Sequence, residues 1–148
     1  MMDAFIPRRK KSPFPMRLIP ISDASLWTLN DLGNGYGALV TADKWLHLKG
    51  TSTTAAATLK KAINFSTAKK ITFSYSQNYS ILPRISLVNV STGKTDYTFT
   101  ATATGTLNNT HTAEMDVSAA KGKYYLSIDT VNPYGDRTCY VKTLEITR

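Results

Sequence analysis

The feature that most constrains this chain is a strict alternation of apolar and polar residues in its second half. In one stretch, Ile71, Phe73 and Tyr75 are separated by single polar residues. A period of two places the apolar side chains on one face of an extended strand and the polar ones on the other. The pattern therefore predicts strands with one buried face. The same alternation occurs at 97–104, 112–117 and 124–129.

Turn-forming residues separate the predicted strands, and their even spacing indicates the fold class. Further strands are expected at 84–90 and 138–147. The apolar phase of the last strand slips between Val141 and Leu144, which predicts a β-bulge there. Many short strands divided by turns are typical of an all-β, antiparallel β-sandwich, which is the fold class that we predict. The turn segments are 31–37, 78–83, 91–94, 105–109, 121–122 and 132–136.

The first half of the chain is less regular. Residues 26–29 are expected to form a short strand, and residues 38–49 an extended run. Alanine, leucine and lysine between 54 and 68 favour helix. The flanking threonines limit its length, so we expect a loop with one or two helical turns. We expect Trp27 and Trp45 in the core, with a ligand-binding platform as the alternative for each.

We assign residues 1–24 to an extended N-terminal arm and residues 25–148 to the β-sandwich domain. Four prolines in the arm remove amide donors and disfavour helix. The arm also carries apolar residues that a freely solvated tail would not need. We therefore expect it to dock on a surface, either its own domain or a protein partner. The expected docking residues are Phe5, Ile6, Arg8, Arg9, Lys10, Lys11 and Phe14.

The formal net charge of +8 raises the question of nucleic acid as a partner. The basic run at 8–11 can neutralise a few phosphates and give weak, salt-sensitive binding. Such a short run carries no base-specific readout, and the domain sequence has no basic face with interleaved aromatic residues. Protein docking is therefore the favoured role of the arm, and nucleic-acid binding the less favoured one.

Composition argues against several other classes. The single cysteine, Cys139, permits no intrachain disulfide. No apolar stretch follows the N-terminal charges, and no run has the length of a membrane span, so we expect neither a secretory signal nor a membrane segment. His47 and His111 stand apart from any metal-ligand spacing, and no pair of carboxylates is spaced for glycoside hydrolysis. We predict no enzyme activity, no metal and no cofactor.

The predicted topology also groups the loops. If neighbouring strands are antiparallel, the loops at 32–37, 77–84, 105–110 and 132–137 share one end of the sandwich. The loops at 50–69, 91–94 and 118–122 then share the other end.

The first group of loops is rich in tyrosine and asparagine. Tyrosine rings stack on the C–H groups of a sugar, while amides and guanidinium groups pair with its hydroxyls. Two alternatives stay open, because tyrosine and arginine are also enriched in protein interfaces and asparagine is a common turn residue. The candidate glycan-binding residues are Tyr36, Asn78, Tyr79, Arg84, Asn109, Tyr134, Asp136 and Arg137.

Residues 25–148 resemble the galactose-binding-like jelly roll found in several families of carbohydrate-binding modules. The resemblance rests on Trp27 in an early strand and on the strands at 69–75, 122–128 and 141–146. It implies a jelly-roll fold with a ligand site in the loops at one end or on the concave sheet face. Many members carry a structural calcium, but this chain has no acidic cluster to hold one.

The threonine-rich strands, the small size and the basic arm together resemble bacteriophage virion proteins of the tail, baseplate or capsid-decoration kind. This resemblance implies a non-catalytic virion component that is made in the host cytoplasm, is anchored to other virion proteins by its arm and binds host-surface glycans. A stand-alone carbohydrate-binding module is the first alternative. A nucleic-acid-associated protein acting through the arm is the second. A homo-oligomer stays open.

Overall fold

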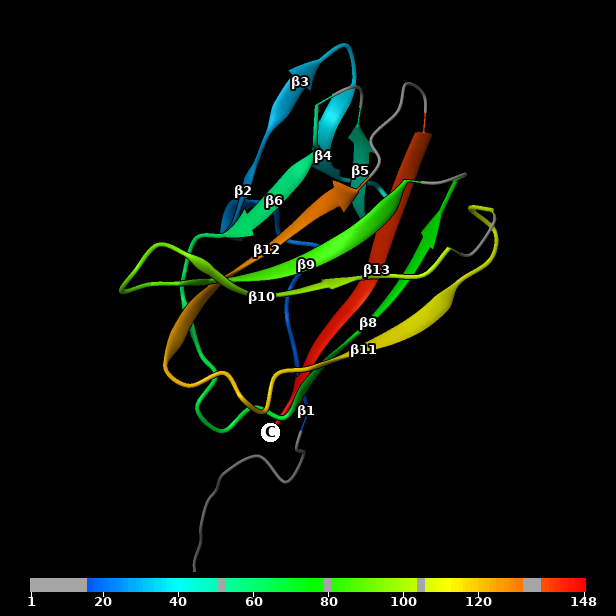
Figure 1. Ribbon diagram of the computed structural model, residues 1–148. Helices are drawn as coiled ribbons and strands as arrows, with labels where there is room; N and C mark the ends of the chain where they lie inside the picture. Colours follow the sequence, from blue (N-terminus) through cyan, green and yellow to red (C-terminus); the bar gives the residue numbers. More distant parts are fainter. Residues whose placement is uncertain (1–15, 51–52, 79–80, 104–105, 132–136) are drawn as a thin grey trace, which may run out of the picture.

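The computed structural model describes residues 16–50, 53–78, 81–103, 106–131 and 137–148. Two antiparallel β-sheets pack against each other and enclose a single apolar core (Figure 1). The described residues contain one 3-10 turn, η1 (Ala24–Leu26), and no α-helix, and none of their segments is a helix long and apolar enough to cross a membrane. The predicted all-β sandwich is confirmed.

The larger sheet has seven strands, and its long strand β13 holds it together. One edge of β13 pairs with β8, while its other edge pairs first with β5 and then with β1. The strands in sheet order are β11 (His111–Asp116), β8 (Lys70–Gln77), β13 (Arg137–Thr147), β5 (Leu46–Gly50), β4 (Tyr36–Val40) and β3 (Asp31–Gly33), with β1 (Met16–Leu18) beside β13.

The smaller sheet has six strands and is centred on β12. This strand pairs with β9 along one edge and with β6 and β7 along the other. The strands in sheet order are β10 (Thr95–Thr100), β9 (Leu82–Asn89), β12 (Lys123–Val131), β6 (Ala56–Leu59) and β2 (Trp27–Leu29), with β7 (Ile63–Asn64) beside β12.

Alternation along the strands builds the core as predicted. Phe73 and Tyr75 of β8 are buried from one sheet, and Leu126 and Ile128 of β12 from the other. Trp27 is also buried, and its Nε1 donates a hydrogen bond to the backbone oxygen of Pro20 at 3.0 Å. A buried indole N–H needs such a partner. The core position expected for Trp27 is confirmed.

The β-bulge predicted in the last strand is also confirmed. The register of β13 against β8 shifts between Val141 and Thr143. The shift lets both Val141 and Leu144 face the core although they are an odd number of residues apart. It also leaves Lys142 on the outer side of the sheet, where it contacts other outward side chains.

The prediction for residues 54–68 is wrong. Strands β6 and β7 occupy this segment, with no helical turn among its residues. Ala55, Ala57 and Leu59 are buried at alternate positions, and the outward Thr58 lies 3.1 Å from Ser127 on β12 between hydroxyl oxygens. Pairing with two neighbouring strands outweighs the helix propensity of alanine, which is a weak preference.

The extra strand also corrects the predicted grouping of the loops. Because β6 crosses the sandwich, residues 53–55 lie at the same end as the candidate glycan loops, and only residues 60–69 lie at the opposite end. The expected extended run at 38–49 is interrupted as well. A turn at 41–45 separates β4 from β5, and Lys44 adopts a positive φ of 68° in it.

The end of the predicted arm lies on the domain. Strand β1 pairs with β13, and Ile19 and Ile21 are buried in the core. The seven predicted docking residues of the arm, at 5–14, lie outside the described residues, so their docking stays a prediction.

Candidate ligand-binding surface

The described parts of the four candidate loops share one end of the sandwich, as predicted. Strands β4, β5, β13, β8 and β11 are consecutive neighbours in the larger sheet. Their register sets Gly37 beside Lys49 and Gln77 beside Cys139. The loops that precede or follow these residues therefore meet at a common edge.

Four of the candidate glycan-binding side chains can be placed in the structure, namely Tyr36, Asn78, Arg84 and Asn109. Tyr79, Tyr134 and Asp136 lie outside the described residues, and only the backbone of Arg137 is described. The roles proposed for these last four residues stay predictions.

Arg84 is not brought together with Tyr36. It lies on β9 between inward-facing residues, and it forms a two-point ion pair with Asp129 of β12. The Nε–Oδ1 and Nη2–Oδ2 distances are 2.9 and 2.6 Å. The hydrogen bonds that Arg84 donates to the Asp129 carboxylate raise the pKa of its guanidinium. Arg84 therefore joins β9 to β12 on the outer face of the smaller sheet, whereas β4 belongs to the larger sheet.

Tyr36 opens β4 and is oriented by the preceding hairpin turn. Asn34 and Gly35 have positive φ values of 54° and 80°, which asparagine and glycine tolerate best. The turn brings the Tyr36 ring to the neighbouring strand, where Lys49 Nζ lies 4.8 Å from the ring centroid. Asn109 lies at the same end, and its backbone N–H donates to Thr106 at 3.2 Å.

A cluster of aromatic residues covers the outer face of the larger sheet beside this end. Tyr140 of β13 pairs with His47 of β5, and their rings stack with a centroid distance of 4.8 Å. Trp45 packs edge-on against Tyr140 at 5.6 Å. All three side chains are half-buried. Burial and the charge of Lys49 lower the pKa of His47, so the imidazole is neutral at pH 7.

Lys142 joins the cluster to the loop end. Its Nζ lies 4.3 Å from the centroid of the Trp45 ring and donates a hydrogen bond to Thr110 Oγ1 at 2.6 Å. Because Thr110 precedes β11 and follows Asn109, the lysine spans β8 to reach the candidate loop at 106–110.

Ser76 of β8 lies opposite Tyr140 in the sheet. It is fully buried, and its Oγ has no hydrogen-bond partner among the described residues. We call the whole surface the aromatic band, and it consists of Tyr36, Trp45, His47, Lys49, Tyr140 and Lys142.

The expectation that Trp45 lies in the core is wrong, and the alternative of a surface platform fits its position. Trp45 precedes the buried Leu46, so strand alternation turns it to the outer face with His47. The alternation of Trp45 and His47 with Leu46 and Leu48 is visible in the sequence. It does not show that Tyr140 lies on the adjacent strand, because these residues are far apart in the chain and only the register joins them.

Two kinds of reactive group can be assessed among the described residues, metal-ligand clusters and the cysteine thiol. No group of three histidine, cysteine, aspartate or glutamate side chains among them could hold a metal ion. Cys139 is fully buried, and burial raises the pKa of its thiol far above the usual range. A thiol in that state is a poor nucleophile.

No protein-family model matches the chain, and a search of curated proteins also found no match. Several solved structures are similar to this chain in fold. TmCBM61, solved in complex with β-1,4-galactotriose, matches with a TM-score of 0.58 and 9% identity over 86% of this chain and 91% of that one. The C-terminal CBM6 of LamC from Zobellia galactanivorans matches with a TM-score of 0.57 and 12% identity over 90% and 99%.

Larger proteins contain the same fold as a part. A family two carbohydrate esterase from Cellvibrio japonicus matches with a TM-score of 0.57 and 12% identity, over 89% of this chain but only 33% of that one. Carbohydrate-binding modules with a galactose-binding-like β-sandwich are thus among the structural neighbours. At these identities the likeness concerns the fold.

Proposed function

We propose that this chain is a non-catalytic carbohydrate-binding module whose aromatic band stacks against sugar rings. The observation that carries the proposal is the half-buried pair of Trp45 and Tyr140 on the outer face of a sheet. An aromatic ring held there by neighbours presents a rigid apolar platform to solvent. Lys142 and Thr110 add polar groups at its edge, where they can meet sugar hydroxyls.

The fold supports the same function. TmCBM61 and the module of LamC show that sandwiches of this shape serve as carbohydrate-binding modules. Small-ligand sites commonly combine an apolar surface with a few placed polar groups, and the aromatic band has this composition. The ion-paired Asp129 and the buried Cys139 support a binding role without catalysis.

The test is a calorimetric titration with β-1,4-galactotriose together with a glycan array. Trp45→Ala and Tyr140→Ala are expected to weaken binding by about tenfold or more, since one stacking contact is worth roughly 1–2 kcal/mol. Tyr125→Ala is the matched control, because Tyr125 is an exposed tyrosine on the smaller sheet. Unchanged affinity in the folded Tyr140→Ala variant, or no binding of any glycan by the native chain, would overturn the proposal.

The same assay separates the aromatic band from the loop residues predicted by sequence. Tyr79→Ala and Tyr134→Ala are measured beside the variants of the aromatic band. If only these two lower the affinity, the site lies in the loops and the aromatic band is structural. If both sets lower it, the ligand spans the loop end and the sheet face, which Lys142 and Thr110 connect.

We also propose, as a second role, that the arm anchors the chain in a larger assembly such as a phage particle. The observation that favours it is the basic run at 8–11, which precedes a strand already fixed to the domain. Replacing the four basic residues of this run by glutamate is expected to abolish incorporation into particles and to leave glycan binding unchanged. Normal incorporation of the variant would contradict this role.

A further inference from the structure

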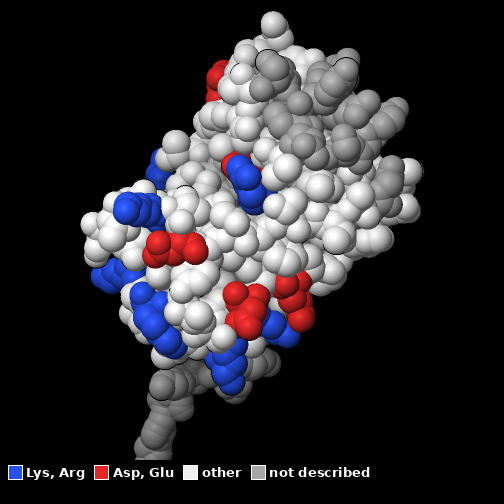
Figure 2. Space-filling model, viewed as in Figure 1, with Lys and Arg blue, Asp and Glu red and all other residues white. Residues whose placement is uncertain are grey.

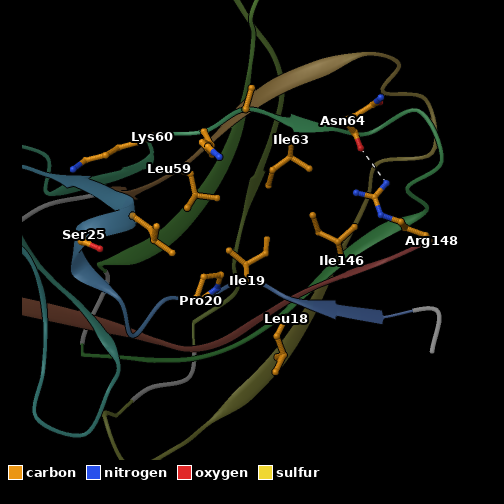
Figure 3. Close-up of a pocket in the computed structure, with 13 residues that line it drawn as sticks. Leu18, Ile19, Pro20, Ser25, Leu59, Lys60, Ile63, Asn64, Ile146 and Arg148 are labelled. Atoms are coloured by element: carbon orange, nitrogen blue, oxygen red, sulfur yellow. Dashed lines mark hydrogen bonds between the residues drawn. The ribbon is translucent and has the colours of Figure 1, made fainter. Parts of the chain in front are cut away.

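A groove opens on the side of the sandwich opposite the candidate loops (Figure 3). It lies between β1 and β13 of the larger sheet and the β6–β7 segment of the smaller one, and its volume is about 660 Å³. Ile19, Leu59 and Ile146 line it and belong to the core. The groove is therefore an opening through which the core reaches the surface, and we call it the side groove.

The rim of the side groove is also apolar. Leu18 and Leu26 line it and are 67% and 40% exposed. They are two of the five large hydrophobic side chains that are exposed in the described part of the chain. Grouped apolar exposure of this kind marks an interaction site more often than a scattered leucine does.

The charged side chains that line the side groove are all basic. Lys60, Lys61 and Arg148 line it, and none of its thirteen lining residues is aspartate or glutamate. Arg148 is held in place, because its Nη1 donates to the backbone oxygen of Asn64 at 3.0 Å (Figure 3). The same Nη1 also donates to Thr67 Oγ1 at 3.0 Å. Lys60 and Lys61 are exposed and form no ion pair with any described residue.

The positive charge extends beyond the groove. Figure 2 shows many lysine and arginine side chains over the half of the visible face nearest to β1, with a smaller number of acidic ones between them. Met16 pairs with Thr147, so the chain upstream of β1 begins beside Arg148. The basic run at 8–11 lies a few residues further upstream and has the same sign as the groove. Charge repulsion therefore disfavours the arm as the occupant.

We infer that the side groove docks an acidic segment of a protein partner. Apolar side chains of that segment would fill the groove over Leu59 and Ile146, where burial supplies most of the affinity. Its carboxylates would meet Lys60, Lys61 and Arg148, which set orientation and speed association. The site is separate from the aromatic band and does not depend on glycan binding.

The experiment selects binders from a display library of short random peptides on the immobilised full chain. Acidic peptides with leucine, isoleucine or phenylalanine are expected to be enriched. A selected peptide should bind the Lys60→Glu/Lys61→Glu double variant about tenfold or more weakly, since each reversed charge removes an attraction and adds a repulsion. Leu18→Ser should also weaken it. The matched control is Lys44→Glu/Lys94→Glu, which reverses two exposed lysines away from the groove and should change the affinity less than about twofold.

Hydrogen exchange with the bound peptide is expected to protect the backbone at 16–20 and 59–64. Three outcomes would overturn the inference. One is the absence of acidic apolar peptides from the selected pool. Another is binding of phosphatidylserine vesicles that needs Lys60 and Lys61 while no peptide binds. The third is a rise in peptide affinity when Phe5, Ile6 and Phe14 are replaced by serine, because the chain's own arm would then be the occupant.

Discussion

Lysines lie beside apolar surface in two regions of this molecule, and the two regions use them differently. In the aromatic band, Lys49 and Lys142 lie over aromatic rings of the same chain. In the side groove, Lys60 and Lys61 extend into solvent beside exposed leucines. The aromatic band is assembled before any ligand arrives, whereas the side groove has cations and apolar surface still open to a partner. The comparison therefore sets a preorganised surface at one end against an open apolar and basic groove at the other.

The largest expected effect comes from the floor of the side groove, by which we mean the core residues Ile19, Leu59 and Ile146. Leu59→Ala should lower the free energy of unfolding by about 2–4 kcal/mol, as for other buried leucines. Leu18→Ala at the rim should change it by less than about 0.5 kcal/mol, since Leu18 is largely exposed. Urea denaturation measures both. Equal losses would show that rim and floor form one packed unit, and the side groove would not be an open surface.

The next largest effect is expected at the buried hydroxyl of Ser76, which lies opposite Tyr140 of the aromatic band. Its Oγ has no hydrogen-bond partner among the described residues, so removing it should relieve a desolvation cost. Ser76→Ala is expected to stabilise the protein by about 1 kcal/mol. Thr72→Ala, at another outward position of β8 that is only half-buried, serves as the control. A clear destabilisation by Ser76→Ala would show that the hydroxyl has a partner.

The contribution of the Lys142 charge should be smaller. Lys142→Met keeps most of the aliphatic stem but removes the contact with the Trp45 ring and the hydrogen bond to Thr110. We expect a loss of about 0.5–1 kcal/mol of unfolding free energy, with a shift in the Trp45 fluorescence. Lys60→Met at the side groove should leave the free energy of unfolding unchanged. If both variants change the free energy of unfolding equally, the distinction between a preorganised region and an open one is wrong.

The smallest effect concerns pH. The pKa of His47 is lowered by burial and by the charge of Lys49, so the unfolded chain takes up a proton more readily than the folded one. The neutral imidazole of His47 therefore adds its full share to the free energy of unfolding above the pKa of the unfolded chain, about 6.5. This share is lost as the pH falls below that value. His47→Gln should flatten the fall in stability between about pH 7 and 5 by less than about 1 kcal/mol. An unchanged slope would mean that the imidazole is solvated in the fold.

Much of the fold could be predicted because it depends on local periodicity. The alternation around Phe73 and the phase slip near Leu144 are visible in the sequence, and both appear as predicted. The prediction failed at Ala55 and Ala57, where alanine favours helix locally and only pairing with two strands makes it extended. At these positions the local preference for helix is weaker than the stabilisation from strand pairing and burial.

The candidate sites were less accessible to prediction. Tyr36 and Asn109 were placed at the correct end by counting antiparallel strands, which needs no knowledge of sheet order. Arg84 was assigned to the same end, but its guanidinium is bound to Asp129 on the outer face of the other sheet. Strand counting locates loops and does not identify the partner of a side chain within a strand.

By itself, the sequence determined which residues face inward on β8 and β12, and the bulge in β13. Those features follow from the period of a pleated strand and from the preference of apolar side chains for the interior. Only the tertiary structure decided that Trp45, Tyr140 and Lys142 meet on one surface, and that Leu18, Leu59 and Arg148 share a groove. Both arrangements depend on register and on sheet packing between distant segments, and no local pattern in the chain encodes them.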